Sequence, residues 1–282
     1  MDRRAFLALM GAGVVTAGAG GLTACSQANP PQGELVLIPN DWEFLSGSDY
    51  RLAVLIASSA HNGAPLPLTA PVTLRVGPEK GPLGPVLKTV IHTEGNEPNY
   101  ALTSYRFDQP GNYNIEATYR TRRVTLPVQV LEPSASTTPV VGAKLVHTPT
   151  PTTATPLGVN PVCTAQPACP FHAVSLDAAL DAHKPIALLF ATPALCQSRF
   201  CGPVLDNLVA VHQAYADRVT FIHCEIYTDL TGQKGVAAVD KFGLQHEPML
   251  YLADESGVIK VRIDNLFDRA EARDALRLAF GP

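Results

Sequence analysis

The sequence predicts a multidomain chain in which an all-β sandwich precedes an α/β domain of three layers. From Gly33, roughly 100 residues form short strand-like runs separated by Pro, Gly and Asn turns. After a Pro/Thr-rich stretch, the last part of the chain alternates helical patterns with apolar strand patterns. With 282 residues, the chain is long enough for two such domains.

The amino-acid composition of the chain limits the classes of partner that we expect. The chain is 46% hydrophobic with a formal charge of −4, so it can bury a substantial core and carries no basic excess. A nucleic-acid partner is therefore not expected, and no cofactor motif is found.

The first 24 residues have the pattern of an export signal: Arg3-Arg4, a short apolar run, and mostly small residues from position 12 to 24. The stretch "DRRAFL" resembles a twin-arginine motif, and "LTAC" resembles the lipobox of bacterial lipoproteins, which implies lipidation of Cys25. A plain signal peptide with an incidental cysteine is the alternative. We expect residues 25–32 to be a tether and the protein to be lipid-anchored at the extracytoplasmic face of a bacterial cell membrane.

Residues 33–132 are predicted to form the sandwich. The strand-like runs are "ELVLI", "YRLAVLIAS", "PVTLRV", "VLKTVIH", "ALTSYRFD", "NYNIEATYR" and "RVTLPVQVL". The segment "DQPGNY" resembles the corner of immunoglobulin-like domains, which implies that Tyr113 closes a turn there. The region has no catalytic constellation, so a binding or spacer role is the default.

Residues 133–160 are rich in Pro, Thr, Ser and Ala, with "HTPTPTTATP" at their centre. This composition predicts a semi-rigid linker, because it offers little apolar surface to bury. The apolar patch "VVGAKLV" within it could still pack along either domain.

Residues 161–282 are predicted to alternate helices and strands in the order α-β-α-β-α-β-β-α. The pattern places helices at "SLDAALDAHK", in "GPVLDNLVAVHQAYAD" with Pro203 as the first helical residue, within "TGQKGVAAVDKFG" and at "DRAEARDALRLAF". The strands are "PIALLFA", "RVTFIHCEIY" and the hairpin of "MLYLAD" with "VIKVRID". Parallel strands followed by an antiparallel hairpin predict an α/β three-layer domain.

Five cysteines follow Cys25, and an exported chain keeps disulfides. Proximity favours the pairs Cys163–Cys169 and Cys196–Cys201, although other pairings stay open. A metal site at Cys163, Cys169 and His172 is the alternative, but the spacing fits no common zinc pattern. Cys224 is either a buried small hydrophobe or a third redox thiol.

The last domain resembles thioredoxin, over residues 176–280. The resemblance rests on an apolar strand leading to Cys196, on Cys201-Gly202-Pro203 opening a helix, and on "GLQHEPMLYLADESGVIKV". It implies that Pro248 is a cis-proline facing Cys196 and Cys201, and that this pair exchanges disulfides.

The chain also departs from thioredoxin. Four residues separate its cysteines instead of two, and Leu189 stands where a buried acid is often found. Either Cys196 or Cys201 could be the nucleophile; the distance from Phe190 favours Cys196, whereas helix position favours Cys201. Arg199 would stabilise a thiolate or is a solvated loop charge.

Three functions remain open. The first is thiol–disulfide exchange with exported proteins, with Cys196, Cys201 and Pro248 at the site. The second is a non-catalytic binding or scaffold lipoprotein with only structural disulfides. The third is Cu(I) delivery by Cys196, Cys201 and His246, in resemblance to thioredoxin-fold copper chaperones.

Overall fold

A computed structural model describes residues 33–95 and 98–282, in which residues from Gly33 onward form one compact unit. Strands (33%) outweigh helices (18%) and form three sheets, so the chain is β-rich and has several sheets. The predicted export signal, the tether and Cys25 lie outside the described residues. Within the described part, no helix has the length and apolar character needed to cross a membrane.

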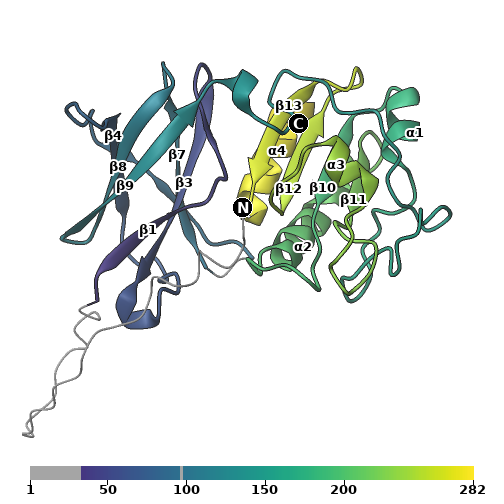
Figure 1. Cartoon of the computed structure of the whole chain (residues 1–282), viewed down its shortest axis with the longest axis horizontal. Coiled ribbons are helices and arrows are strands. Elements are labelled where there is room, and N and C mark those ends of the chain that lie inside the picture. Colours follow the sequence, from purple (N-terminus) through teal and green to yellow (C-terminus); the bar gives the residue numbers. More distant parts are fainter. Residues whose placement is uncertain (1–32, 96–97) are drawn as a thin grey trace, which may run out of the picture. The chain divides into compact units, whose positions relative to one another are not determined.

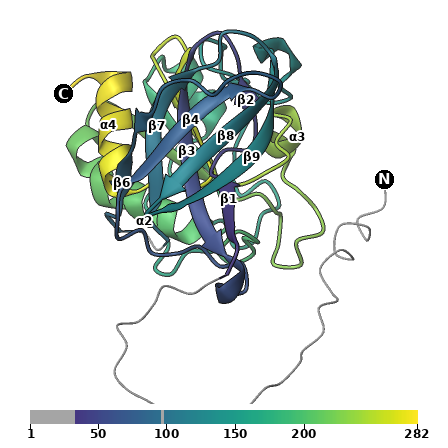
Figure 2. The same ribbon diagram turned by 90° about the vertical axis from the view of Figure 1, so that its left-hand side faces the viewer.

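The first half is a sandwich of two sheets (Figure 2). One sheet has the order β1-β3-β7-β6 and the other the order β2-β9-β8-β4-β5. All neighbours are antiparallel except β2 and β9. The strands are β1 (Leu35–Pro39), β2 (Phe44–Leu45), β3 (Asp49–Ser58), β4 (Val72–Pro78), β5 (Leu87–Lys88), β6 (Val90–His92), β7 (Tyr100–Arg106), β8 (Gly111–Tyr119) and β9 (Arg122–Leu131).

Strand β3 is buried on both faces. Side chains alternate along a strand, so Leu52, Val54 and Ile56 lie in the core of the sandwich. Ala53 and Leu55 point the other way and lie in a core that also contains helices of the second half. The continuous apolar run of β3 therefore joins two cores.

The predicted corner is confirmed at Tyr113, whose hydroxyl donates a hydrogen bond to the carbonyl of Gln109 at 2.9 Å. This contact joins the start of β8 to the turn before it.

The segment predicted as a linker packs along the second half. The Leu145 amide donates to the Gly257 carbonyl at 2.8 Å, and Lys144 forms a bridge with Val258. The Thr150 hydroxyl accepts a hydrogen bond from the Leu176 amide, at the start of a helix. Hydrogen bonds of backbone and hydroxyl groups thus order much of this stretch. Its few apolar side chains contribute as well, since Leu145 of the patch "VVGAKLV" and Val159 are buried in a core of the second half.

The second half is a four-stranded sheet of order β11-β10-β12-β13 between two helical layers (Figure 1). Strands β10 and β11 are parallel, and the other neighbours are antiparallel. Side chains of α2 and α4 share one core with the sheet, and those of α1 and α3 share the other. The elements are α1 (Leu176–Asp181), β10 (Ile186–Phe190), α2 (Cys201–Val211), β11 (Thr220–Cys224), α3 (Ala237–Lys241), β12 (Met249–Ala253), β13 (Ile259–Asp264) and α4 (Arg269–Phe280), with short 3-10 helices at Ser59–His61, Pro133–Ala135 and His212–Tyr215.

Helix α2 begins at Cys201, two residues earlier than the predicted start at Pro203. Proline is still tolerated there, because the first N–H groups of a helix have no partner within the helix. The disulfide therefore joins the first helical residue to the loop before it.

Buried charges join the sandwich to α4. Arg51 on β3 donates to both carboxylate oxygens of Glu271 and, at 2.8 Å, to Asp41. The hydroxyl of Tyr100 donates to the same Glu271 carboxylate. Asp268 caps α4 by accepting from the Glu271 amide, and it also contacts His92 at 2.8 Å. The start of α4 is therefore fixed by side chains of the sandwich.

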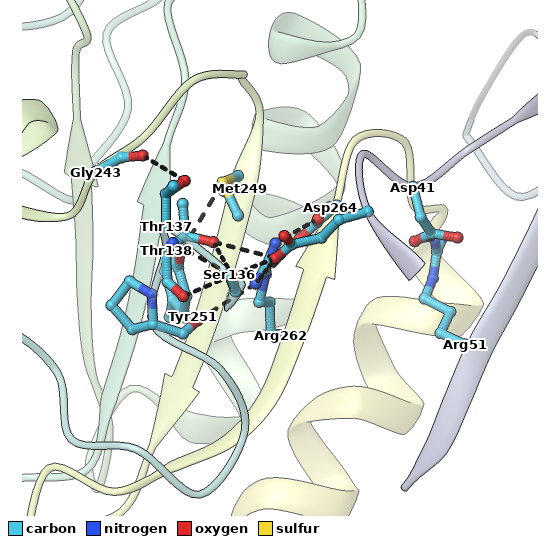
Figure 3. A network of polar contacts seen from close by, with 12 residues as sticks. Asp41, Arg51, Ser136, Thr137, Thr138, Gly243, Met249, Tyr251, Arg262 and Asp264 are labelled. Atoms are coloured by element: carbon cyan, nitrogen blue, oxygen red, sulfur yellow. Dashed lines mark hydrogen bonds and ion pairs between the residues drawn. The ribbon is translucent and has the colours of Figure 1, made fainter. Parts of the chain in front are cut away.

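A second bridge is centred on Arg262 of β13 (Figure 3). Its guanidinium donates two hydrogen bonds to Asp264, at 2.8 and 2.7 Å, and a third to Glu43 at 2.7 Å. Since Glu43 lies next to β2, this residue joins the α/β sheet to the sandwich. Arg262 and Asp264 are both buried, so the pair is shielded from solvent.

We expect Arg51→Met to lower the free energy of unfolding by about 3–5 kcal/mol, because it leaves the buried carboxylates of Glu271 and Asp41 without their cation. Arg277→Met on the exposed face of α4 is the matched control and should change little. Urea unfolding of the full chain measures both. Equal losses in the two variants would contradict a stabilising role for the buried pair.

Candidate functional site

Cys196 and Cys201 form a disulfide at the carboxyl end of β10, with Cα atoms 5.9 Å apart. Cys196 lies in the loop that follows β10, and Cys201 is the first residue of α2. The Cα separation is within the range that a disulfide allows. The predicted pairing of these two cysteines is confirmed.

The two sulfurs differ in access and in hydrogen bonding. Cys201 is fully buried, whereas Cys196 is partly exposed. The Cys201 amide lies 3.3 Å from the Cys196 sulfur and donates to it, and the Ser198 hydroxyl lies 3.2 Å from the same atom. Donors at a helix start stabilise a thiolate. The geometry therefore favours Cys196 as the sulfur that a partner reaches first.

Arg199 lies in the loop between the two sulfurs. It is exposed and has a left-handed backbone, with φ of 64°.

A half-buried carboxyl group lies beside the disulfide. The sulfurs of Cys196 and Cys201 and a carboxylate oxygen of Glu247 are all within 4.8 Å of one another. Burial raises the pKa of Glu247 to about 7, although hydrogen bonds from Thr192 oppose the shift. Glu247 can therefore gain or lose a proton near neutral pH.

Glu247 was not among the predicted site residues. It directly precedes Pro248, and the Glu247–Pro248 peptide bond is cis, as the sequence predicts. The sequence contains a signal that points to Glu247. Leu189 stands in place of the usual acid, and Glu247 is the acid nearest to the predicted cis-proline. In the structure this acid approaches the sulfurs from the start of β12 rather than from β10.

The predicted alternative metal set of Cys196, Cys201 and His246 does not form in the described part of the chain. His246 stacks on Trp42, with ring centroids 4.1 Å apart, and Glu247 takes the place near the sulfurs. Neighbouring residues of an extended segment point in opposite directions, which separates these two side chains.

A second group of sulfur and nitrogen atoms lies at the same end of the sheet. Cys163 and Cys169 are free thiols, so the predicted Cys163–Cys169 disulfide is wrong for this structure. Their sulfurs instead lie near the rings of His172 and His223, and the four donor atoms are within 4.8 Å of one another. A hydrogen bond with Cys169 lowers the pKa of the Cys163 thiol. His223 could not be found from spacing, because it lies on β11, far along the chain from the other three residues.

Cys224 lies on the other side of the sheet. Alternation along β11 places His223 beside Cys169, while Cys224 is buried in the core shared with α1 and α3. Burial raises the pKa of its thiol. The structure therefore does not bring Cys224 together with the Cys196–Cys201 pair, and the interpretation as a small hydrophobe fits its place.

Comparisons with known proteins identify no family for this chain. No family model and no curated protein matches it. One similar solved structure is a chimeric titin Z1Z2 functionalized with a KLER exogenous peptide from decorin, which is 17% identical. The match covers 36% of this chain and 95% of that chain, with a TM-score of 0.21. A match with so low a TM-score does not establish the fold of any part of this chain.

We expect the free energy of unfolding of the oxidised chain to fall by about 3 kcal/mol as the pH rises from about 4.5 to about 7, because of Glu247. The folded-state pKa of about 7 lies above the ordinary glutamate pKa of 4.5, so the contribution of Glu247 is fully present below about pH 4.5. It is lost between these two values, as the unfolded chain releases the proton first.

Urea unfolding of wild type and Glu247→Gln at several pH values measures this difference, with exposed Glu255→Gln as the control. The Gln variant should lack this part of the pH dependence, and Glu255→Gln should keep it. The same pH slope in all three proteins would refute the assignment.

Proposed function

We propose that this protein is a thiol–disulfide exchange protein of thioredoxin type that acts on exported proteins from a lipid anchor on Cys25. Support for the fold assignment comes from the sheet order β11-β10-β12-β13, the disulfide between β10 and α2, and the cis-proline before β12. For the sandwich, the Tyr113 corner supports an immunoglobulin-like type. The anchor and the export route rest on the sequence pattern alone.

One observation carries the exchange function. A partly exposed sulfur, on Cys196, accepts a hydrogen bond from the first amide of α2, and it shares its surroundings with a carboxyl group whose pKa is about 7. Exchange needs an accessible thiolate and a group that handles the proton of the second thiol. Both are present within one small region.

The reaction has two steps. The Cys196 thiolate attacks a partner disulfide, which forms a mixed disulfide and releases one partner thiolate that takes a proton from water. The Cys201 thiol then gives its proton to the Glu247 carboxylate and attacks the Cys196 sulfur, which releases the second partner thiolate. Two electrons pass from the protein dithiol to the partner disulfide, and the Cys196–Cys201 bond reforms. The reverse sequence oxidises a partner dithiol.

Glu247 takes the role of the proton-accepting acid, which the apolar side chain of Leu189 cannot fill. One of its carboxyl oxygens is buried and has no hydrogen-bond partner in residues 33–95 and 98–282. A proton can therefore sit on that oxygen and be passed to a sulfur nearby. Nearby charged or titratable groups are Glu225 and His223.

We expect Cys201→Ser to trap mixed disulfides with partner proteins through Cys196, because the buried resolving sulfur is gone. Cys196→Ser should trap none, since Cys201 is not reachable from solvent. Non-reducing gels and mass spectrometry of exported proteins measure the trapping, with Cys224→Ser as the control. Absence of trapped species in Cys201→Ser would favour a scaffold with a permanent disulfide.

We expect Glu247→Gln to slow reduction of the Cys196–Cys201 bond by dithiothreitol roughly tenfold or more below pH 7. Attack at Cys196 expels the Cys201 thiolate, which needs a proton that Gln cannot supply. The rate of reduction of the wild-type disulfide, divided by the concentration of dithiothreitol thiolate, should fall as the pH rises through about 7. Alkylation followed by mass spectrometry gives the rates.

Glu255→Gln is the matched control and should keep the wild-type profile. A flat wild-type profile, or the same inflection in Glu247→Gln, would remove Glu247 from the mechanism.

A further inference from the structure

We propose that Cys163, Cys169, His172 and His223 form a tetrahedral site for one Zn²⁺ ion. Residues 163–172 supply three of the donors from the loop before α1, and β11 supplies the fourth. The donor atoms are the two Sγ atoms, Nε2 of His172 and Nδ1 of His223. The site does not depend on the proposed exchange reaction.

The spacing of the donors fits zinc. Zn–S bonds of about 2.3 Å and Zn–N bonds of about 2.0–2.1 Å at tetrahedral angles place sulfur and nitrogen about 3.5 Å apart and two nitrogens about 3.3 Å apart. The Cys169 sulfur lies 3.3 Å from His172 Nε2 and 3.4 Å from His223 Nδ1, and the two nitrogens are 3.2 Å apart. The Cys163 sulfur is 3.9 Å from His223 Nδ1. These four separations are close to the edges of a tetrahedron that zinc would fill, and the other two donor pairs are within 4.8 Å.

The charge and the burial of the four donor residues also fit a zinc ion. His223 is fully buried and His172 is nearly so, while the two cysteines are half-buried. Two thiolates with two neutral imidazoles balance the charge of Zn²⁺, so the occupied site is neutral in a buried place. Four protein donors leave no open position, which is typical of a structural site rather than a catalytic one.

Outer contacts support two of the four ligands, His223 and Cys163. The Nε2 atom of His223 lies 2.9 Å from the Ala191 carbonyl and donates to it, which leaves Nδ1 with its lone pair toward the sulfurs. The Cys169 amide donates to the Cys163 sulfur at 3.3 Å. Glu225 accepts from the amide and the hydroxyl of Thr164, next to Cys163. Such support around the ligands is usual in metal sites.

The donor set selects zinc among the common metals. Two thiolates with two imidazoles in a tetrahedron suit Zn²⁺, whereas Ca²⁺ and Mg²⁺ prefer oxygen donors. The ion would hold residues 163–172 against β11, directly beside the Ala191 carbonyl that precedes the disulfide loop. It would also keep Cys163 and Cys169 from oxidising to each other.

Metal analysis of the purified full chain, prepared without chelator, tests the site. We expect about one zinc per chain after gel filtration, and its loss in Cys163→Ser and in His172→Gln. Cys224→Ser and His212→Gln are matched controls that should retain zinc, because neither residue supplies a donor atom to the site.

Cobalt substitution gives a second measurement that needs no variant. The wild-type chain, stripped of metal and with reduced Cys163 and Cys169, should bind one Co²⁺ per chain with the intense visible absorption of tetrahedral thiolate coordination, and zinc should displace it.

Four results would overturn the proposal: a reduced chain that takes up neither metal, ligand variants that hold as much zinc as wild type, copper in place of zinc in the purified chain, or a Cys163–Cys169 disulfide in it. Because metal content is measured without any exchange assay, failure of the zinc site and failure of the exchange function are distinguishable.

Discussion

The turn that ends β10 is the constraint on which the candidate site depends. The Ala191 carbonyl accepts the ring N–H of His223, and the Thr192 hydroxyl accepts the amide of Ile226 at 2.8 Å. These contacts tie the turn to β11, the parallel neighbour of β10, and to the residues directly after it. The loop to Cys196 starts from this fixed point, and Thr192 also hydrogen-bonds to Glu247 from the other neighbouring strand. The candidate site is made from three separate stretches of chain. Hydrogen bonds to Ala191 and Thr192 hold these stretches together.

Much of the fold could be predicted from sequence because the patterns are local. Period-two runs gave β4 and β8, continuous apolar runs gave β10 and β12, and the Asp268 cap with Glu271 three residues on gave the start of α4. Strand β2 has only two residues, Phe44 and Leu45, which is too short for a pattern. The prediction of a semi-rigid linker missed how fully this segment is ordered, because threonine hydroxyls and backbone groups hold much of it. The packing of the patch "VVGAKLV" was foreseen as a possibility, and its Leu145 is buried in the core of the α/β half.

The candidate site could be predicted only in part, because its members meet through the fold. Cys196, Cys201 and Pro248 carry signals in their immediate neighbours, such as Gly202-Pro203 and the following apolar strand. Glu247 looks like any polar residue in a turn until its burial is known. His223 lies in an apolar strand, where a histidine is most simply explained as part of the core. Its contact with Cys169 and His172 depends on the loop of residues 163–172 lying along β11, where the His223 amide donates to the Phe171 carbonyl at 3.0 Å, and no short pattern specifies this.

The double burial of β3 has a consequence for how this protein can change over time. Ala53 and Leu55 contribute to the core of the α/β half, while Leu52, Val54 and Ile56 fill the sandwich. Neither half would present a water-compatible surface if the other were removed, since β3 would then expose an apolar face. The sandwich is therefore not an interchangeable accessory that recombination could swap for another domain. Substitutions on β3 and on the facing side of α4 have to compensate each other, so the two halves are expected to be inherited and to diverge as a single unit.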